Sequence, residues 1–429
     1  MSDWQQISLG DLETPVGRKV AVPLQASQAS QASQASVGDG YPLRPLGEVM
    51  ALDIQRTPMT PATTYRLAGV LNAGKGVVAK GELDGGDTEY AAMNVLRAGQ
   101  VVMRKLTAWE GPITVVPAEF DGFVVSNEFP TFTLGPELMP AWMRHVCGSP
   151  RLWAEMKNRV SGTVQRRKRL NPEQLLQIQL PIPPREVQAR VVEILDAVDD
   201  QIAALDKETE ALDRVSMAVA EEMLAGEQTV GLGTMLNEIR GGKSPQANNR
   251  PPSANEIGVL KVSAVTPFAF LPEESKSLLP GTIMPEAALV QPGDVLITRA
   301  NTPLRVGAVA RVPADVRDGL YLADKTLRLV PSSELDPDFL VVAMALKSAR
   351  THLTSSATGT SASMVNVSQG RIRETPIPLP DLGRQSKVAS AVLSVRANTD
   401  AVRAEATRLR KARSGLLAGL LDQSITIDI

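Results

Sequence analysis

Cationic and amide side chains are the residues in this sequence with the most suggestive chemistry. Arg and Lys match guanine edges and phosphates, while Asn and Gln match adenine edges, so such residues in loops predict contacts with nucleic acid. The densest cationic run is Arg166, Arg167, Lys168 and Arg169, which follows a Gly162-Thr163 pair. We expect this run to contact DNA.

Further candidates follow apolar, strand-like runs, because a strand end can deliver a side chain into a groove. Arg104 and Lys105 follow one run, and Arg299 and Asn301 follow another. In the second half of the chain, the counterpart of the basic run is the segment 361–366, which carries hydroxyls and an amide but no charge. We therefore predict that these two segments read different base sequences. The DNA-binding candidates are Arg104, Lys105, Gln165, Arg166, Arg167, Lys168, Arg169, Lys243, Arg299, Asn301, Arg305, Ser361 and Asn366.

Enzyme motifs are incomplete in this sequence. A DNA methyltransferase needs an Asn- or Asp-Pro-Pro-aromatic loop, whereas residues 171–174 read NPEQ. Residues 69–76 approach a phosphate-binding loop but end in glycine where a hydroxyl is required. One cysteine, Cys147, and two distant histidines offer no set of metal ligands. We therefore predict no catalytic residues and no metal site.

The formal net charge of -2 hides an uneven distribution. Lys plus Arg against Asp plus Glu count 16 to 13 in residues 41–180, 4 to 12 in 181–227, 15 to 13 in 228–376 and 8 to 5 in 377–429. Two mildly basic blocks therefore flank an acidic segment, and we expect that segment to present a protein-binding or solvated face rather than to follow a phosphate backbone.

The chain divides into five segments by residue composition and pattern. Residues 1–40 contain four Gln-Ala-Ser triplets, a low-complexity tether. Residues 41–180 and 229–376 mix short β-rich runs with Gly and Pro and predict α/β domains. Residues 181–228 and 377–429 each start with a Pro-x-Pro strap and predict one long helix. The start of the chain lacks the pattern of a signal peptide and no apolar run could span a bilayer, so we expect a cytoplasmic protein without a membrane partner.

Aliphatic residues recur every seven positions in both predicted helices, which is typical of a coiled-coil seam. Thr209 and Ser216 interrupt a second row, where we expect weaker packing. The seam, which is also a candidate partner interface, comprises Val191, Leu195, Val198, Ile202, Leu205, Leu212, Val219, Val388, Val395, Val402, Leu409 and Leu416.

The two halves repeat with an offset of 197 positions. This offset relates the Gly-Thr pairs, the straps, Gln188 to Gln385, and five aliphatic seam positions in each helix. Two matching helices in one chain would most simply pair antiparallel. The predicted fold class is α+β: two tandem α/β domains, separated by two long helices that form an antiparallel coiled coil with pseudo-twofold symmetry.

The order of these pieces resembles one known family, the specificity subunits of Type I restriction-modification systems. The motifs that carry the resemblance are PLGEV at 45–49, GQVVMRKL at 99–106, VSNEF at 125–129, LG at 232–233, GGKSP at 241–245, PGDVLITR at 292–299, the two straps and SGLLAGLL at 414–421. Their order, present twice, is more specific than any single piece.

The resemblance implies a DNA-recognition subunit that reads a target in two parts. It also implies partners: double-stranded DNA, two DNA methyltransferase subunits, and restriction or translocase subunits. S-adenosylmethionine, ATP and Mg²⁺ would then be bound by those partners and not by this chain. Two alternatives stay open at this point. One is the specificity subunit of a related methylating nuclease or phage-defence complex, and the other is a coiled-coil scaffold that does not read DNA.

Overall fold

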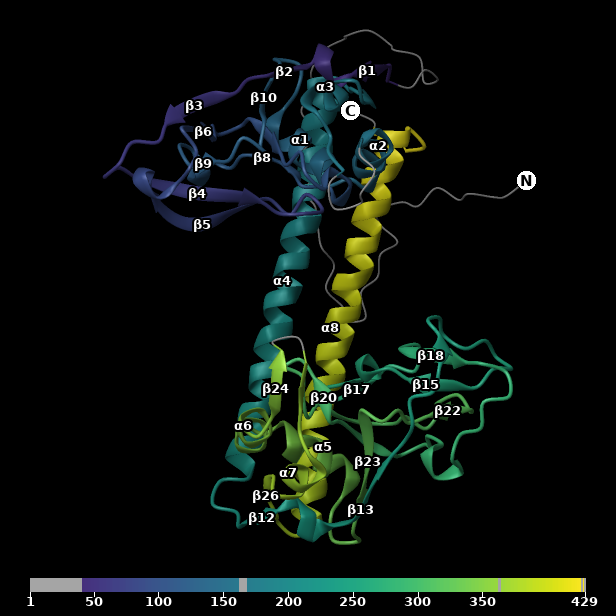
Figure 1. The fold of residues 1–429 in the computed structure, drawn as a ribbon. Coiled ribbons are helices and arrows are strands. Elements are labelled where there is room, and N and C mark those ends of the chain that lie inside the picture. Colours follow the sequence, from purple (N-terminus) through teal and green to yellow (C-terminus); the bar gives the residue numbers. More distant parts are fainter. Residues whose placement is uncertain (1–40, 162–167, 362–363, 426, 428–429) are drawn as a thin grey trace, which may run out of the picture.

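The computed structural model describes residues 41–161, 168–361, 364–425 and 427. Two helices dominate it: α4 (Arg185–Met223) and α8 (Leu382–Asp422). At ~1.5 Å per residue each is about 60 Å long. They run side by side, and one α/β domain lies at each end (Figure 1). The predicted N-terminal extension, residues 1–40, lies outside the described residues.

The first domain combines a four-stranded frame with a five-stranded outer sheet. The frame has the order β2 (Met50–Leu52), β10 (Thr131–Leu134), β7 (Val101–Met103) and β8 (Ile113–Val115). The outer sheet has the order β3 (Gln55–Pro58), β6 (Ala92–Val95), β9 (Val124–Val125), β4 (Thr64–Val70) and β5 (Val77–Asp84). Its helices are α1 (Pro140–Cys147), α2 (Pro150–Arg159) and α3 (Pro172–Leu176), and β1 (Leu43–Pro45) pairs with β11 (Gln179–Pro181) before α4 begins.

The second domain repeats the frame but not the outer sheet. Its frame has the order β13 (Leu236–Gly241), β23 (Thr326–Pro331), β19 (Val295–Thr298) and β21 (Val309–Arg311). Helices α5 (Pro337–Ala345), α6 (Lys347–Ser355) and α7 (Gln369–Arg373) follow, and β12 (Thr229–Gly231) pairs with β26 (Pro376–Pro378) before α8 begins. The remaining strands are β14 (Ala247–Asn248), β18 (Ser275–Leu278), β15 (Gly258–Leu260), β22 (Leu320–Tyr321), β16 (Val265–Thr266), β17 (Ala269–Phe270), β20 (Ala300–Asn301), β25 (Met364–Asn366) and β24 (Thr358–Ser361).

The two helices are antiparallel, and each one joins both domain cores. Helix α4 leaves the first domain, and its far end places Ala220 in the core of the second. Helix α8 leaves the second domain, and its far end places Leu417 and Leu421 in the core of the first. The predicted fold class is therefore confirmed, because two α/β domains are held apart by one pair of long helices whose ends are buried in both domains.

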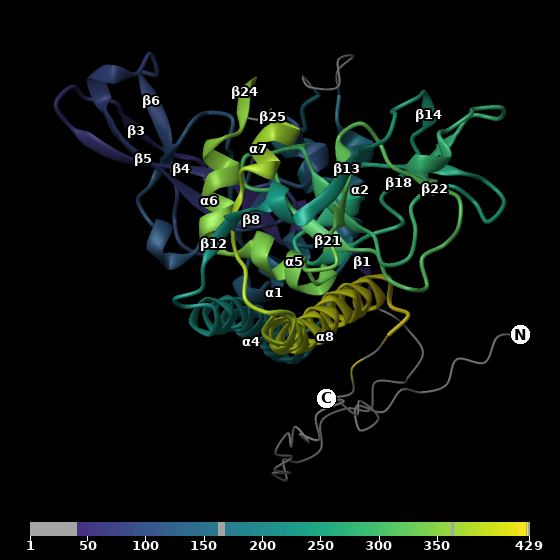
Figure 2. The ribbon, with the colours of Figure 1, turned by 90° about the horizontal axis from the view of Figure 1, so that it is seen from below.

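Both domains lie on the same side of the helix pair when the molecule is viewed along the helices (Figure 2). Strands β24 and β25 of the second domain lie on the side that points away from the helices. A linear polymer could therefore pass both domains along one face of the molecule.

Candidate DNA interface and the helices that position it

The second domain brings three of the predicted DNA-binding residues into one small sheet. Strand β20 pairs with β25, so that Ala300 lies opposite Asn366 and Asn301 lies opposite Val365. Arg299 immediately precedes β20, and its carbonyl accepts a hydrogen bond of 2.8 Å from the Val367 amide. A cation and two amides are thus held at adjacent positions, although they are far apart in the sequence.

Two more cations lie beside this sheet. Arg305 is exposed in the turn after β20, which Arg350 supports by donating 2.8 Å and 3.1 Å bonds to the carbonyls of Val306 and Leu304. The Lys325 Nζ lies 3.6 Å from the Met364 sulfur, and the Lys325 carbonyl accepts a hydrogen bond from the Arg299 amide. Sequence reasoning missed Lys325, because it lies before a different strand and no motif marks it.

The remaining candidates of this domain are placed less closely. Lys243 is exposed in the segment between β13 and β14. Its preceding residue, Gly242, donates a backbone hydrogen bond to Ala323, two residues before Lys325. Ser361 ends β24, but its side chain lies outside the described residues.

The first domain builds the same junction from different residues. The Leu170 amide donates a 3.0 Å bond to the Lys105 carbonyl, and the Thr107 amide donates one of 3.0 Å to the Lys168 carbonyl. A bridge also pairs Leu106 with Arg169, whose guanidinium lies 3.0 Å from Glu128. Lys105, Lys168 and Arg169 are thus brought together, whereas Gln165, Arg166 and Arg167 lie outside the described residues.

The two junctions correspond residue by residue. Lys105 and Arg299 accept the same backbone bond, and Arg169 and Asn366 occupy the same bridge position. The first junction offers ammonium and guanidinium groups, which suit phosphates and guanine, whereas the second adds amides, which suit adenine. Two equivalent frames therefore present side chains that suit different bases.

Arg104 differs from the other candidates because its donors are used inside the domain. Its guanidinium donates bonds of 2.8 Å to the Asn72 side chain, 2.7 Å to the Thr107 hydroxyl and 3.0 Å to the Leu106 carbonyl. Thr107 has a φ of 56°, a left-handed conformation that needs local support. These contacts give Arg104 a part in holding the turn that presents Lys105.

A regular set of ion pairs joins the helices that separate the two junctions. Asp199, Asp206 and Asp213 recur every seven residues on α4, and the equivalent positions of α8, 197 residues on, are arginines. Arg396 and Arg403 pair with Asp213 at 2.6 Å and 2.7 Å, Arg410 with Asp206 at 2.6 Å, and Arg413 with Asp199 at 2.8 Å. These three aspartates of the acidic helix therefore bind α8, while others of its acidic residues, such as Asp200, are exposed. A solvated or partner-binding acidic face stays a prediction for that exposed part.

The seam residues divide into a buried and a half-buried group. Val191, Leu195, Ile202, Leu205 and Val388 are buried, and Thr209 and Ser216 are buried with them. Their hydroxyls differ: that of Ser216 donates 2.8 Å to the Asp213 carbonyl, whereas that of Thr209 has no hydrogen-bond partner among the described residues. The weaker packing expected at Thr209 and Ser216 stays a prediction, because burial alone does not measure it. The half-buried seam residues are Val198, Leu212, Val219, Val395, Val402, Leu409 and Leu416.

His145 of α1 is the centre of a polar contact between the first domain and both helices. It is 2% exposed, and its Nε2 lies 2.9 Å from Asp196 while its Nδ1 lies 2.9 Å from an Arg413 nitrogen. Burial, reinforced by neighbouring Arg144, lowers the pKa of this imidazole. Because Arg413 can only donate, Nδ1 accepts and Nε2–H donates to Asp196, which is the neutral form.

The same residues form a candidate metal site by composition, since ligand atoms of His145, Asp196 and Asp199 lie within 4.8 Å of one another. However, Arg144 donates to Asp196 at 2.5 Å and Arg413 donates to Asp199. These carboxylates are already neutralised by guanidinium groups, so the cluster is an ion-pair network that docks the first domain.

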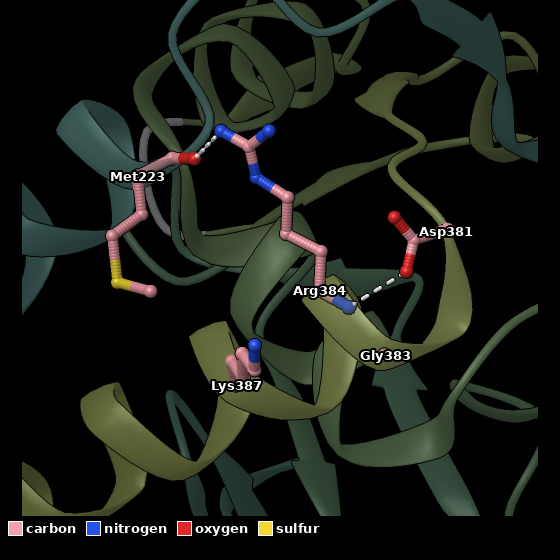
Figure 3. A pocket seen from close by; sticks show the side chains of 5 residues that line it. All are labelled: Met223, Asp381, Gly383, Arg384 and Lys387. Atoms are coloured by element: carbon pink, nitrogen blue, oxygen red, sulfur yellow. Dashed lines mark hydrogen bonds between the residues drawn. The ribbon is translucent and has the colours of Figure 1, made fainter.

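A pocket lies where the end of α4 meets the beginning of α8, at the second domain (Figure 3). It is lined by Met223, Asp381, Gly383, Arg384 and Lys387. Arg384 donates 2.8 Å to the Met223 carbonyl and pairs with Glu227 at 2.7 Å, while Asp381 accepts from the Arg384 amide at 3.0 Å. The pocket side chains thus tie the end of α4 to the beginning of α8.

Comparison with known families now adds to this geometry. Residues 154–214, which run from α2 through most of α4, match the family described as the Type I restriction modification DNA specificity domain. This segment of the chain is therefore similar to that specificity domain. The resemblance inferred from the sequence is thereby confirmed, and the matched segment includes the first strap and the Asp199, Asp206 and Asp213 repeat.

One curated relative and two solved structures are similar to this chain. The Type I restriction enzyme EcoEI specificity subunit of Escherichia coli is 30% identical over 174 residues, which span 40% of this chain and 29% of that protein. A structure from work on assembly and conformational transition of the type I R-M system has a TM-score of 0.51 at 19% identity, covering 90% of this chain and 99% of its own. The HsdS subunit from Thermoanaerobacter tengcongensis has a TM-score of 0.41 at 18% identity, with coverages of 90% and 98%.

These likenesses concern the fold and the specificity domain. The match with a TM-score of 0.51 extends over nearly the whole of both chains, so the arrangement of two domains and two helices has a solved counterpart.

Among the residues that the structure describes, none forms a helix with the length and apolarity needed to span a membrane.

Proposed function

We propose that this chain is the DNA-recognition subunit of a Type I restriction-modification complex and has no catalytic role of its own. The observation that carries the proposal is the pair of equivalent junctions with unequal chemistry. Lys105 and Arg169 stand at one junction, and Arg299 and Asn366 stand at the other. A duplicated frame with different base-matching groups is what reading two different half-sites requires.

The helix pair would set the distance between the two half-sites. Duplex DNA presents equivalent faces about every 34 Å, and helices of about 60 Å, estimated from ~1.5 Å per residue, can hold two readers one turn or more apart. Both domains lie on one side of the helices (Figure 2), so a single straight duplex could meet both. The helices act as a rigid spacer in this proposal.

The partners in this proposal are double-stranded DNA and modification subunits of the methyltransferase type. The EcoEI relative is named as a specificity subunit, and a solved relative comes from work on assembly of the type I R-M system. Half-buried Val395, Val402 and Leu409 leave apolar surface along α8 that partner helices could cover. We further propose two modification subunits per chain, with restriction subunits outside them, and S-adenosylmethionine, ATP and Mg²⁺ bound by those partners.

Methylome sequencing tests the proposal. Cells that express this chain with a modification subunit encoded beside it should acquire one methylated motif, made of two specific half-sites and a fixed non-specific gap. Insertion of one heptad into α4 and one into the opposing part of α8 should lengthen the gap and leave both half-sites unchanged. Absence of any new motif would favour a protein scaffold, and a gap that ignores the insertion would disprove the spacer.

A further inference from the structure

One buried glutamine is placed identically in each half of the chain. Gln188 lies on the first turn of α4 and Gln385 on the first turn of α8, and they are 0% and 1% exposed. Neither side chain makes a hydrogen bond to a junction residue, yet sequence and structure repeat both. A polar side chain is buried without cost only when its hydrogen bonds are made.

Gln188 makes every hydrogen bond that an amide side chain needs. Its Oε1 accepts 2.8 Å from the Met139 amide, and its Nε2 donates 2.8 Å to the Glu137 carbonyl and 2.8 Å to the Pro183 carbonyl. Met139 precedes α1 and Pro183 belongs to the strap. One side chain therefore ties the domain, the strap and the long helix together.

Gln385 repeats the arrangement in the second half. Its Oε1 accepts 2.8 Å from the Asp336 amide, and its Nε2 donates 3.0 Å to Glu334 and 2.9 Å to Pro380, both at the carbonyl. Each partner lies 197 positions beyond its counterpart in the first half. The repetition of all three bonds indicates one task performed twice.

That task follows from the directionality of hydrogen bonds. The apolar contact of α1 with α4 is non-directional and tolerates small rotations, whereas three bonds to one planar amide fix an angle. Only an amide offers two donors and an acceptor at this size, because Asn is one methylene too short and Glu cannot donate when ionised.

We propose that Gln188 and Gln385 are positioning residues that fix the angle between each domain and its long helix, and so restrict the protein to one gap between half-sites. The claim that these residues restrict the gap between half-sites rests on the proposed function. The claim that they fix the angle between each domain and its helix does not depend on DNA. The two parts can therefore be tested separately.

The DNA test uses the full chain with its modification subunit. Gln188→Met and Gln385→Met preserve side-chain length and remove the three bonds. Each variant should methylate the same half-sites, but sites with a gap one base pair longer or shorter should gain at least tenfold in methylation. Ile113→Val, a small change in the fully buried core of the first domain, is the matched control and should keep the wild-type gap. A gap as strict as in the wild type in both Gln variants would overturn the inference.

The angle test measures the distance between the domains in the full chain without DNA. Spin labels on cysteines at exposed positions 82 and 273 report one domain each. Cys147 is buried, and burial raises the pKa of its thiol, so it resists labelling. Well below the unfolding midpoint, either Gln variant should broaden the distance distribution, while Ile113→Val should not. An unchanged distribution would make the glutamines stabilising residues only. If the wild-type chain directs no two-part methylation, the proposed function fails, and this measurement still decides the angle.

Discussion

The two domains share the part that touches the helices and differ in the part that extends from them. Both frames have four strands in the same order, and in both domains a short strand pair joins the first strand to the last one before the long helix. The outer sheets differ: the first domain has five strands, whereas the second has a four-stranded sheet of order β14-β18-β15-β22, with β16 and β17 as an additional pair. The duplication has thus preserved the parts that position the domains and changed the parts that extend away from the helices.

Separate apolar cores make this division possible. The frame core of the first domain contains Leu417 and Leu421 of α8, and that of the second contains Ala220 and Leu224 from the end of α4 and beyond. Each frame also packs against smaller clusters away from the helices, which contain Phe123 with Val102 of β7 in the first domain and Phe270 with Leu296 of β19 in the second. An outer sheet can change without disturbing the helix pair, because these smaller clusters contain no residue of α4 or α8.

The comparison predicts that each junction governs one half-site alone. Asn301→Ala with Asn366→Ala removes both amides of the second junction, and one good base contact is worth about 1–3 kcal/mol of discrimination. Methylation should therefore fall or relax by roughly ten- to a hundredfold at one half-site of the motif, while the other half-site stays unchanged. Methylome sequencing measures this, and Asn398→Ala on the exposed face of α8 is the control. Equal losses at both half-sites would contradict the assignment of one junction to one half.

The architecture could be predicted from sequence because its signals are local and repeated. Prolines at both straps, residues 186–224 without Pro or Gly, and an offset of 197 fixed the helices and their duplication. The junctions were predicted only in part. Lys325 reaches the Arg299 segment through a loop from a different strand, and no spacing in the sequence encodes that approach. Arg104 was grouped with Lys105 by adjacency, although neighbouring residues on an extended segment point in opposite directions.

The helices differ in one respect that the apolar repeat alone did not reveal. Positions 199, 206 and 213 are aspartates, whereas their equivalents at 396, 403 and 410 are arginines. The sequence contained both series, but whether they face each other depends on the antiparallel register, which places Asp206 against Arg410. Complementary charge therefore favours pairing α4 with α8 over pairing either helix with its own copy.

Charge reversal at one pair measures this preference. Asp206→Arg removes an ion pair and places two cations together, so the free energy of unfolding should fall by about 1 kcal/mol, given the usual range for exposed pairs. Adding Arg410→Asp should restore most of the loss, which urea denaturation of both single variants and the double variant would quantify as a coupling energy. Asp200→Arg, at an exposed position of α4, is the control and should lack that rescue. Strict additivity of the two changes would remove the pair as a determinant of helix pairing.

A further predicted effect concerns how each domain docks on the helices. His145 docks the first domain through Asp196 and Arg413, with Arg144 and Asp199 facing the same cluster, whereas the equivalent position in the second domain is buried Val342. Burial lowers the pKa of His145 in the folded chain, so below the ordinary value of about 6.5 the unfolded chain takes up a proton that the folded chain does not.

Stability should therefore decrease as the pH falls through about 6.5 toward 5.5 and should be insensitive to His145 well above about 6.5. One such proton contributes at most about 1.4 kcal/mol per pH unit, and less near the midpoint of the titration. Urea denaturation at several pH values measures the slope, and His145→Gln should flatten it, because the amide does not titrate. A variant with an undiminished slope would place the acid sensitivity elsewhere and make the two docking contacts equivalent in their response to pH.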